Sequence, residues 1–342
     1  LGGLAAVVVV LLVGIRVTLG GGEPYPDVST APRLPAERLE VLVELPLPPG
    51  NVATSGASGR IFFNTHPFTQ PERFADAFVF ELVDGQPRPY PSAELQPRLR
   101  GVLGMTVDRL DRLWLVSPPG LEDRPTLLMA FDLTTNALVF EHELGEEAGM
   151  FSQDLRVSPD GNTVYLADTG AFFLSSPAIV VLDVQTRQAR RVLAGHPSIE
   201  PQAFQIRTKD GPYELAWGLV TFSVGVDGLA VSHDGEWLYY ATMSHDTLYR
   251  VPTAALRDPS RSADALAAAV EAVGRKPLSD GIAIDAAGQV YITDVENGGL
   301  AVMSPQGELQ TLVKDASITW ADGVALAPDD AVLFTDSQIP AY

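Results

Sequence analysis

The sequence contains no cysteine, which excludes disulfides, thiolate metal sites and cysteine nucleophiles. Its five histidines show neither HxH nor HExxH spacing, so the sequence gives no support for a histidine-based zinc site. Basic residues are scarce, with 23 Lys and Arg against 43 Asp and Glu, for a formal net charge of −20 at pH 7. Because proteins that bind a phosphate backbone need a basic surface, this balance argues against a nucleic-acid partner.

Two further motifs are missing, the Gly-x-Ser-x-Gly of serine hydrolases and a phosphate-binding glycine loop before a helix. What the chain does have is a 46% content of hydrophobic residues, enough for a large packed core. It also has 30 glycines and 27 prolines, the residues that terminate strands and form tight turns. This composition favours many short strands over an α/β architecture.

The N-terminal 22 residues differ from the rest, because an apolar run from Leu4 to Ile15 (LAAVVVVLLVGI) is followed by glycines. Its length fits the core of a signal peptide and approaches that of a membrane-spanning helix. We expect residues 1–22 to be a signal peptide or membrane anchor, which predicts a secreted, periplasmic or membrane-anchored protein. The alternative is a buried N-terminal element. Residues 23–38 form a proline-rich linker, and the alternation of Leu39–Leu45 (LEVLVEL) predicts one strand docked on the following domain.

An internal repeat organises residues 39–342. Six segments share an apolar alternation, a turn and a second alternating strand: 50–64, 103–117, 153–168, 227–241, 280–294 and 322–336. The second residues of these segments are separated by 53, 50, 74, 53 and 42 positions, and the longest interval contains an insertion around 195–226. Repeats of this length that open with a hairpin are typical of β-propellers.

The fifth repeat shows a full unit of four strands, at Ile282–Asp285, Gln289–Thr293, Leu300–Ser304 and Glu308–Val313. The only clear helical pattern, Ala263–Val273, lies between two repeats. We therefore predict an all-β fold, a six-bladed β-propeller with four-stranded antiparallel blades, whose last blade is truncated after two strands. Asn51, Gly104, Asp154, Gly228, Gly281 and Gly323 are expected at equivalent positions around the central channel.

One mouth of that channel should be acidic, because the first strand of each blade starts where the second strand ends. The strand starts bring Asn51, Gln153, Asp154, Asp227, Asp280 and Asp322. The strand ends bring Asn64, Asp168, His245, Asp294, Glu296, Asn297 and Asp336. Converging carboxylates bind a hard cation or hold shifted pKa values for proton transfer. The alternative for each Asp-Gly pair is an ordinary turn residue.

Within this mouth we assign tentative roles. His245, which titrates near neutral pH when unperturbed, is the candidate general acid or base together with Asp154. The carboxylates would meet an amine, and Phe68, Phe151, Phe222 and Trp320 would stack on a planar ring. Inter-blade packing is the alternative for these aromatics. The ligand-binding candidates are Asn51, Gln153, Asp322, Asn297, Phe151 and Trp320.

The segments LYRVPTAALRDPS (248–260), VGRKPLSDGIAID (273–285) and YITDVENGG (291–299) resemble the bacterial form of the yellow/major royal jelly protein family. The resemblance covers roughly residues 39–342 and is densest from 220 onward. It implies a secreted six-bladed propeller that binds an aromatic amine or another small ligand. It also implies, as an open alternative to binding alone, isomerase or tautomerase activity on an indole-quinone-like substrate.

A more distant similarity connects the chain to gluconolactonase/regucalcin-type propellers, which hold a divalent cation with a Glu, an Asn and an Asp. Asp280 matches the Asp, Asp227 stands in place of the Asn, and Gly50-Asn51 stands where the Glu is expected. Phe151 replaces the arginine that reads the sugar acid. The similarity implies a Ca²⁺ or other divalent-cation site at Asp227, Asp280 and Asn51. A cation-dependent lactonase or hydrolase is thus the alternative function, and a protein-docking platform is a third.

Overall fold

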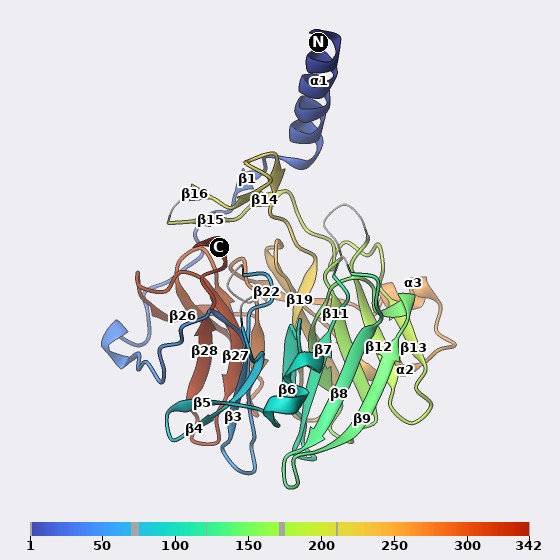
Figure 1. Cartoon of the computed structure of the whole chain (residues 1–342), viewed down its shortest axis with the longest axis vertical. Coiled ribbons are helices and arrows are strands. Elements are labelled where there is room, and N and C mark those ends of the chain that lie inside the picture. Colours follow the sequence, from blue (N-terminus) through green and yellow to red (C-terminus); the bar gives the residue numbers. More distant parts are fainter. Residues whose placement is uncertain (1, 70–74, 121, 171–174, 210, 342) are drawn as a thin grey trace.

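The computed structural model describes residues 2–69, 75–120, 122–170, 175–209 and 211–341, and consists mainly of antiparallel four-stranded sheets (Figure 1). The first two sheets contain β2 (Pro49–Thr54), β3 (Ile61–Thr65), β4 (Val79–Val83) and β5 (Gln86–Pro89), then β6 (Gly104–Val107), β7 (Arg112–Ser117), β8 (Thr126–Asp132) and β9 (Ala137–Leu144). The third contains β10 (Ser152–Val157), β11 (Thr163–Asp168), β12 (Ala178–Asp183) and β13 (Ala189–Val192). Each sheet follows chain order, so every blade is a simple meander.

The fourth blade contains β19 (Val226–Val231), β20 (Trp237–Thr242), β21 (Thr247–Pro252) and β22 (Glu271–Arg275). The fifth contains β23 (Ile282–Ile284), β24 (Val290–Asp294), β25 (Gly299–Met303) and β26 (Leu309–Lys314). The sixth repeat forms only β27 (Ala321–Leu326) and β28 (Val332–Asp336). The predicted propeller with four-stranded antiparallel blades is therefore confirmed, but the described residues form five such blades rather than six.

The first strands of the six repeats nevertheless surround one axis. Their contacts run in the order β2, β6, β10, β19, β23 and β27, and β27 packs against β2 again. Close approach of backbones explains the glycines at the repeat position. A Cβ on Gly281 would lie 2.5 Å from the carbonyl oxygen of Asp322, and one on Gly323 would lie 2.7 Å from the Cα of Asn51. The predicted ring of equivalent positions is thus present.

The core lies between the blades, because both faces of a middle strand are covered by neighbouring sheets. The consecutive residues from Leu113 to Val116 on β7 are fully buried, as are those from Val164 to Ala167 on β11. Such strands are apolar without alternation, whereas outer strands such as β9 are exposed along part of their length. Trp114, Leu155 and Val180 belong to one of these inter-blade clusters.

The chain before the first blade is a helix followed by an extended strap. Helix α1 (Gly2–Leu19) leads to β1 (Glu23–Pro24), which pairs in parallel with β14 (Phe204–Gln205). Within the described residues no helix has both the length and the apolar character needed to cross a membrane. The backbone N–H groups of Arg33 and Leu34 then donate to Thr311 and Leu312 along the outer strand β26.

The strand predicted at Leu39–Leu45 is not formed. After the short helix η1 (Ala36–Arg38) this stretch is irregular, and Val41 is 77% exposed. The strap already occupies part of the edge of β26, and the prolines on either side of the segment cannot donate ladder hydrogen bonds. The alternation alone was therefore insufficient to make a strand.

The insertion between the third and fourth repeats carries four more short strands. They are β15 (Arg207–Thr208), β16 (Gly211–Pro212), β17 (Glu214–Leu215) and β18 (Val220–Thr221). The helix predicted at Ala263–Val273 is shorter than expected. Helices α2 (Thr253–Arg257) and α3 (Ala263–Ala267) form, and the chain then turns into β22 because its fourth strand is needed to complete the blade. The described residues also form the short 3-10 helices η3 (Ala93–Arg98), η4 (Glu146–Ala148) and η5 (Ile339–Ala341).

Candidate functional site

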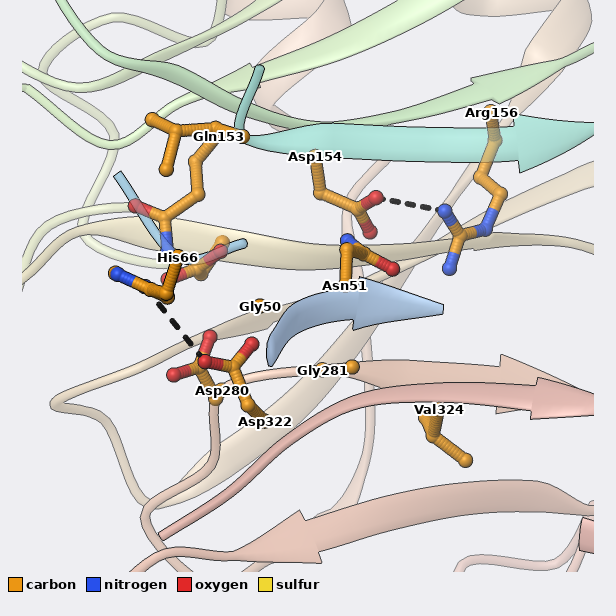
Figure 2. Close-up of a pocket in the computed structure, with 13 residues that line it drawn as sticks. Gly50, Asn51, His66, Gln153, Asp154, Arg156, Asp280, Gly281, Asp322 and Val324 are labelled. Carbon is orange, nitrogen blue, oxygen red and sulfur yellow. Dashed lines mark hydrogen bonds and ion pairs between the residues drawn. The ribbon is translucent and has the colours of Figure 1, made fainter. Parts of the chain in front are cut away.

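A small cavity lies at the channel mouth where the inner strands begin, and below we call this end of the propeller the mouth (Figure 2). Its lining residues are Gly50, Asn51, His66, Leu103, Gln153, Asp154, Arg156, Asp227, Asp280, Gly281, Asp322, Gly323 and Val324. It leaves about 20 Å³ for the centres of water-sized molecules, which is room for little more than one water or one small charged group. The structure therefore brings together Asn51, Gln153, Asp154, Asp227, Asp280 and Asp322, as the repeat predicted.

Irregularities in the strand pairing aim these side chains at the cavity. The register shifts at the start of four inner strands, between Pro49 and Val52, Ser152 and Asp154, Val226 and Gly228, and Ala321 and Val324. The residues skipped by these shifts include Asn51, Gln153, Asp227 and Asp322, all of which line the cavity. β-Bulges commonly re-aim side chains next to functional sites. Here the same device recurs at equivalent positions around the ring.

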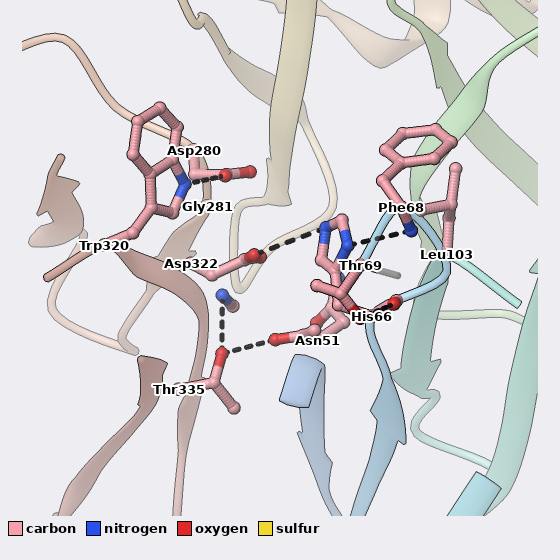
Figure 3. Close-up of polar contacts among 12 residues, drawn as sticks. Asn51, His66, Phe68, Thr69, Leu103, Asp280, Gly281, Trp320, Asp322 and Thr335 are labelled. Carbon is pink, nitrogen blue, oxygen red and sulfur yellow. Dashed lines mark hydrogen bonds and ion pairs between the residues drawn. The ribbon is translucent and has the colours of Figure 1, made fainter. Parts of the chain in front are cut away.

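Short polar side chains at the ends of the second strands hold these irregular segments. The backbone N–H of Asn51 donates to the Asn64 side chain at 2.6 Å. The N–H groups of Asp280 and Gly281 donate to Thr293 Oγ1 at 2.9 and 3.1 Å. In the sixth repeat the N–H of Gly323 donates to Thr335 Oγ1 at 3.0 Å (Figure 3). In these three repeats the second strand thus fixes the start of its own first strand.

Two carboxylate oxygens in this cluster lack a hydrogen-bond partner among the described residues. Asp227 Oδ2 and Asp322 Oδ2 are buried and accept no hydrogen bond from the described residues. The neighbouring carboxylates do have partners: Asp280 Oδ2 accepts a hydrogen bond from Trp320 Nε1 at 2.7 Å, and Asp154 forms an ion pair with Arg156 at 2.7 Å. A buried carboxylate without a partner is costly, so these two oxygens mark the part of the mouth that is suited to a positive ligand.

The electrostatics of the cluster agree with this geometry. Burial and the negative charge of Asp280 raise the pKa of Asp227 and of Asp322 well above the ordinary carboxyl value. Burial also raises the pKa of Asp280 to about 7, against the opposing effect of the Trp320 hydrogen bond. Like charges this close need a cation or a shared proton. Two cations of the chain oppose this effect: Arg156 pairs with Asp154, and the buried Lys276, whose own pKa burial lowers to about 7, acts on Asp227. The pKa values of Asp227, Asp280 and Asp322 remain raised in spite of them.

His66 is the functional candidate that sequence reasoning underrated. Its Nδ1 accepts from the backbone N–H of Phe68 at 3.2 Å, which leaves Nε2 to carry the proton, 3.7 Å from Asp322 Oδ2 (Figure 3). Burial lowers the pKa of His66 to about 4, so the imidazole is neutral at pH 7. Its position directly after β3, in the stretch that follows the second strand of a blade as His245 does, was the signal available in the sequence.

His245 does not line the described cavity. It is buried against Tyr249, with ring centroids 5.3 Å apart, and its Nδ1 accepts from the N–H of Thr247 at 3.1 Å. Burial and the neighbouring Lys276 lower its pKa to about 4. Of the two acid or base candidates, His245 and Asp154, only Asp154 lines this cavity.

Two other candidates are engaged elsewhere. Asn297 donates from Nδ2 to both carboxylate oxygens of Asp294 at 3.1 Å, outside the cavity lining. Trp320 is fully buried and packs edge-on against Tyr213 and Phe222, so its ring is not free to stack on a ligand. For Trp320 and Phe222 the packing interpretation is therefore the correct one.

Phe68 and Phe151 form an aromatic rim beside the acidic mouth. Their ring centroids are 5.6 Å apart, and Phe68 lies 5.6 Å from the ring of His66. Phe68 is 51% exposed, and Phe151 is part-buried. As for the predicted cation site, Asn51, Asp227 and Asp280 line one cavity, but among the described residues no group of three or more His, Asp or Glu is arranged to hold a metal ion.

Comparisons with known proteins agree with this architecture. The family model of the major royal jelly proteins matches residues 100–326, more than half of the chain. No curated protein matches. Among solved structures, a gluconolactonase from Xanthomonas campestris is similar, with 14% identity, a TM-score of 0.57, and coverage of 87% of this chain and 85% of that one. The calcium-binding regucalcin from Agrobacterium tumefaciens has 16% identity, a TM-score of 0.56, and coverage of 89% and 87%. At these identities the likeness concerns the fold.

Proposed function

The chain belongs to the major royal jelly protein family, and we propose that it binds a small ligand with a protonated amine at the acidic mouth of its propeller. The observation that carries the proposal is the pair of buried, unpartnered oxygens, Asp227 Oδ2 and Asp322 Oδ2. An ammonium group offers three N–H donors and one positive charge, which meets both needs at once. We also propose that residues 1–22 direct the protein to a place outside the cytoplasm.

The size of the cavity restricts how such a ligand binds. About 20 Å³ accommodates the ammonium group but no ring, so the rest of the ligand stays at the rim. There the half-exposed ring of Phe68 and the partly buried ring of Phe151 offer an apolar contact for a planar group. An arylalkylamine, with a ring and an amine joined by a short chain, therefore fits better than a compact or a purely aliphatic amine.

If the ligand is also turned over by isomerisation, His66 replaces His245 as the proton-exchanging group. Its Nε2 faces Asp322 within the cavity lining, whereas His245 lies outside it. A divalent cation is the second candidate occupant, because the same unpartnered carboxylate oxygens are the ligands that Ca²⁺ prefers. That occupant would favour the cation-dependent hydrolase alternative.

Titration calorimetry at pH 8 tests the proposal with tyramine, its neutral isostere tyrosol, and calcium chloride. We expect tyramine to bind, tyrosol to bind at least about tenfold more weakly, and Asp227→Asn to reduce tyramine affinity by about tenfold or more. The matched control is Asp160→Asn, an exposed turn residue at the opposite end of the propeller, which should leave affinity unchanged.

Equal binding of tyramine and tyrosol would contradict the proposal, and so would an unaffected Asp227→Asn variant. Binding of calcium without any binding of tyramine would replace it by the divalent-cation alternative. Because Asn keeps the volume of Asp, a loss of binding in this variant reports the charge rather than the packing.

A further inference from the structure

The insertion between the third and fourth blades lies on the same side of the propeller as the acidic mouth. Trp320, which donates to Asp280 at 2.7 Å, packs against Tyr213 and Phe222 of the insertion, with ring centroids 5.5 and 6.1 Å apart. Tyr213 and Phe222 flank the hairpin of β17 and β18. The hairpin therefore rises from the side of the molecule that bears the cavity.

Helix α1 is fixed to this hairpin. Arg16 Nη1 lies 2.8 Å from Glu214 Oε1 on β17, α1 contacts β18, and Thr221 Oγ1 donates to the carbonyl of Gly21. Parallel pairing of β1 with β14 anchors the chain that follows the helix. Figure 1 shows α1 standing away from the propeller body above this region.

Helix α1 and the hairpin carry most of the large hydrophobic side chains that are exposed among the described residues. Every residue from Val7 to Val13 is exposed, and Val17 is 76% exposed, so no face of this part of α1 is covered. At the tip of the hairpin Trp217 is 100% exposed, in a turn where Ala216 and Trp217 both have positive φ. A helix that is apolar all round belongs in a protein core or in lipid.

We propose that α1 and Trp217 together dock on a phospholipid bilayer and turn the acidic mouth toward the lipid surface. Trp is a side chain suited to the headgroup level of a membrane. Arg16, through its ion pair with Glu214, holds the propeller end of α1 beside the hairpin that carries Trp217. The net charge of −20 opposes anionic lipid, so we expect docking to favour a zwitterionic bilayer.

This arrangement has a consequence for access to the cavity. A ligand that reaches the mouth enters through the layer of water and headgroups between propeller and membrane. The docking surface does not depend on what the mouth binds, so the two proposals fail independently.

Fluorescence of the full chain with phosphatidylcholine vesicles tests the docking. Trp114 and Trp320 are fully buried and Trp237 is partly covered, so Trp217 is the one tryptophan that can reach lipid. We expect the emission to shift to shorter wavelength with vesicles and to be quenched by brominated phosphatidylcholine. Trp217→Phe should abolish most of that quenching while the protein still floats with the vesicles through α1.

Co-flotation provides a second measurement. Trp217→Lys should reduce the vesicle-bound fraction several-fold, whereas Leu110→Lys should leave it unchanged, because Leu110 is 54% exposed in a turn at the opposite end of the propeller. Both positions are exposed turns, so circular dichroism should show the same fold for both variants. Absence of bromolipid quenching in the parent would overturn the proposal. So would a lipid-free dimer in which Trp217 is already shielded, since a second copy would then be the occupant.

Discussion

The two ends of the propeller carry the same residue type in opposite states. At the mouth, Asp227 and Asp322 are buried, and burial with neighbouring negative charge raises the pKa of both. At the other end, which we call the turn face, Asp160 and Asp234 are exposed in hairpin turns. Hydrogen bonds from Ser158 and Ser232 lower the pKa of these two carboxyls.

The difference comes from the partner that each carboxylate finds. A turn-face Asp accepts from a Ser two residues earlier in the chain, so its environment is local and complete. A mouth Asp meets side chains from other blades, as Asp280 meets Trp320 and Asp322 meets His66. One oxygen each of Asp227 and Asp322 accepts no hydrogen bond from the described residues. Repetition of an acidic residue therefore indicates a turn when the nearby sequence supplies its partner, and a site when it does not.

The largest expected effect comes from two buried tryptophans that donate to Asp at opposite ends. Trp320 makes the only hydrogen bond that the described residues give to the Asp280 carboxylate, whereas the Asp108 carboxylate that accepts from Trp114 also accepts from Arg112. At pH 8 we expect Trp320→Phe to cost about 3–4 kcal/mol of unfolding free energy, roughly 1–2 kcal/mol more than Trp114→Phe. Urea denaturation measures both, and equal costs would remove the distinction between the ends.

The second prediction concerns the pH dependence of amine binding. Because the pKa of Asp280 is about 7 and those of Asp227 and Asp322 are raised, the mouth gains negative charge as the pH rises through neutrality. Tyramine stays protonated over this range, so its affinity should increase about tenfold from pH 6 to pH 8.5. Calorimetry in matched buffers measures the profile. A flat profile would mean that the mouth carboxylates do not contact the amine.

Much of the acidic mouth could be predicted from the sequence. The repeat located the ring and eight of the cavity-lining positions, because glycine and acidic residues recur where inner strands approach each other. The pairing of Trp320 with Asp280 and the contact of His66 with Asp322 were not accessible, since both depend on side chains brought together from different repeats. The irregular state of Leu39–Leu45 was missed because alternation says nothing about whether a sheet edge is free.

The third prediction concerns the thermal stability of the ligand-free protein and its dependence on pH. A carboxyl whose pKa is raised on folding binds its proton more tightly in the native state, so its favourable contribution is lost as pH rises through the native pKa. Asp227→Asn removes that loss and should raise Tm by roughly 2–5 °C at pH 8 but little at pH 5. His66 and His245, with pKa values near 4, act in the opposite direction below pH 6.5, so the comparison is between variant and parent at each pH.

Asp234→Asn is the matched turn-face variant for calorimetric scans. Its pKa is lowered by Ser232, so the substitution should lower Tm slightly or leave it unchanged at both pH values. A rise in Tm at pH 8 for Asp234→Asn as large as that for Asp227→Asn would show that net charge, rather than burial at the mouth, governs the effect.

The smallest effect is expected at the turn face itself. Ser158 donates to Asp160 and accepts from the N–H of Thr163 at 2.9 Å, closing the hairpin of the third blade. Ser158→Ala should cost about 0.5–1 kcal/mol of unfolding free energy and leave tyramine affinity unchanged. A change in affinity would indicate coupling along β10 between the two ends, which the local character of the turn does not predict.

The contact between β2 and β27, which we call the seam, joins the first and last repeats and closes the ring, so it bears on the rates of folding and unfolding. Thr54 Oγ1 donates to the carbonyl of Leu326 at 2.6 Å, and Thr335 Oγ1 donates to that of Gly50, so these bonds join positions more than 270 residues apart. Contacts of such high sequence separation form late in folding, and without cysteine no covalent bond locks them. We therefore expect the seam to close last and open first. A cation held between Asp227 on β19 and Asp322 on β27 would link the last repeat to the fourth and slow the opening of this contact.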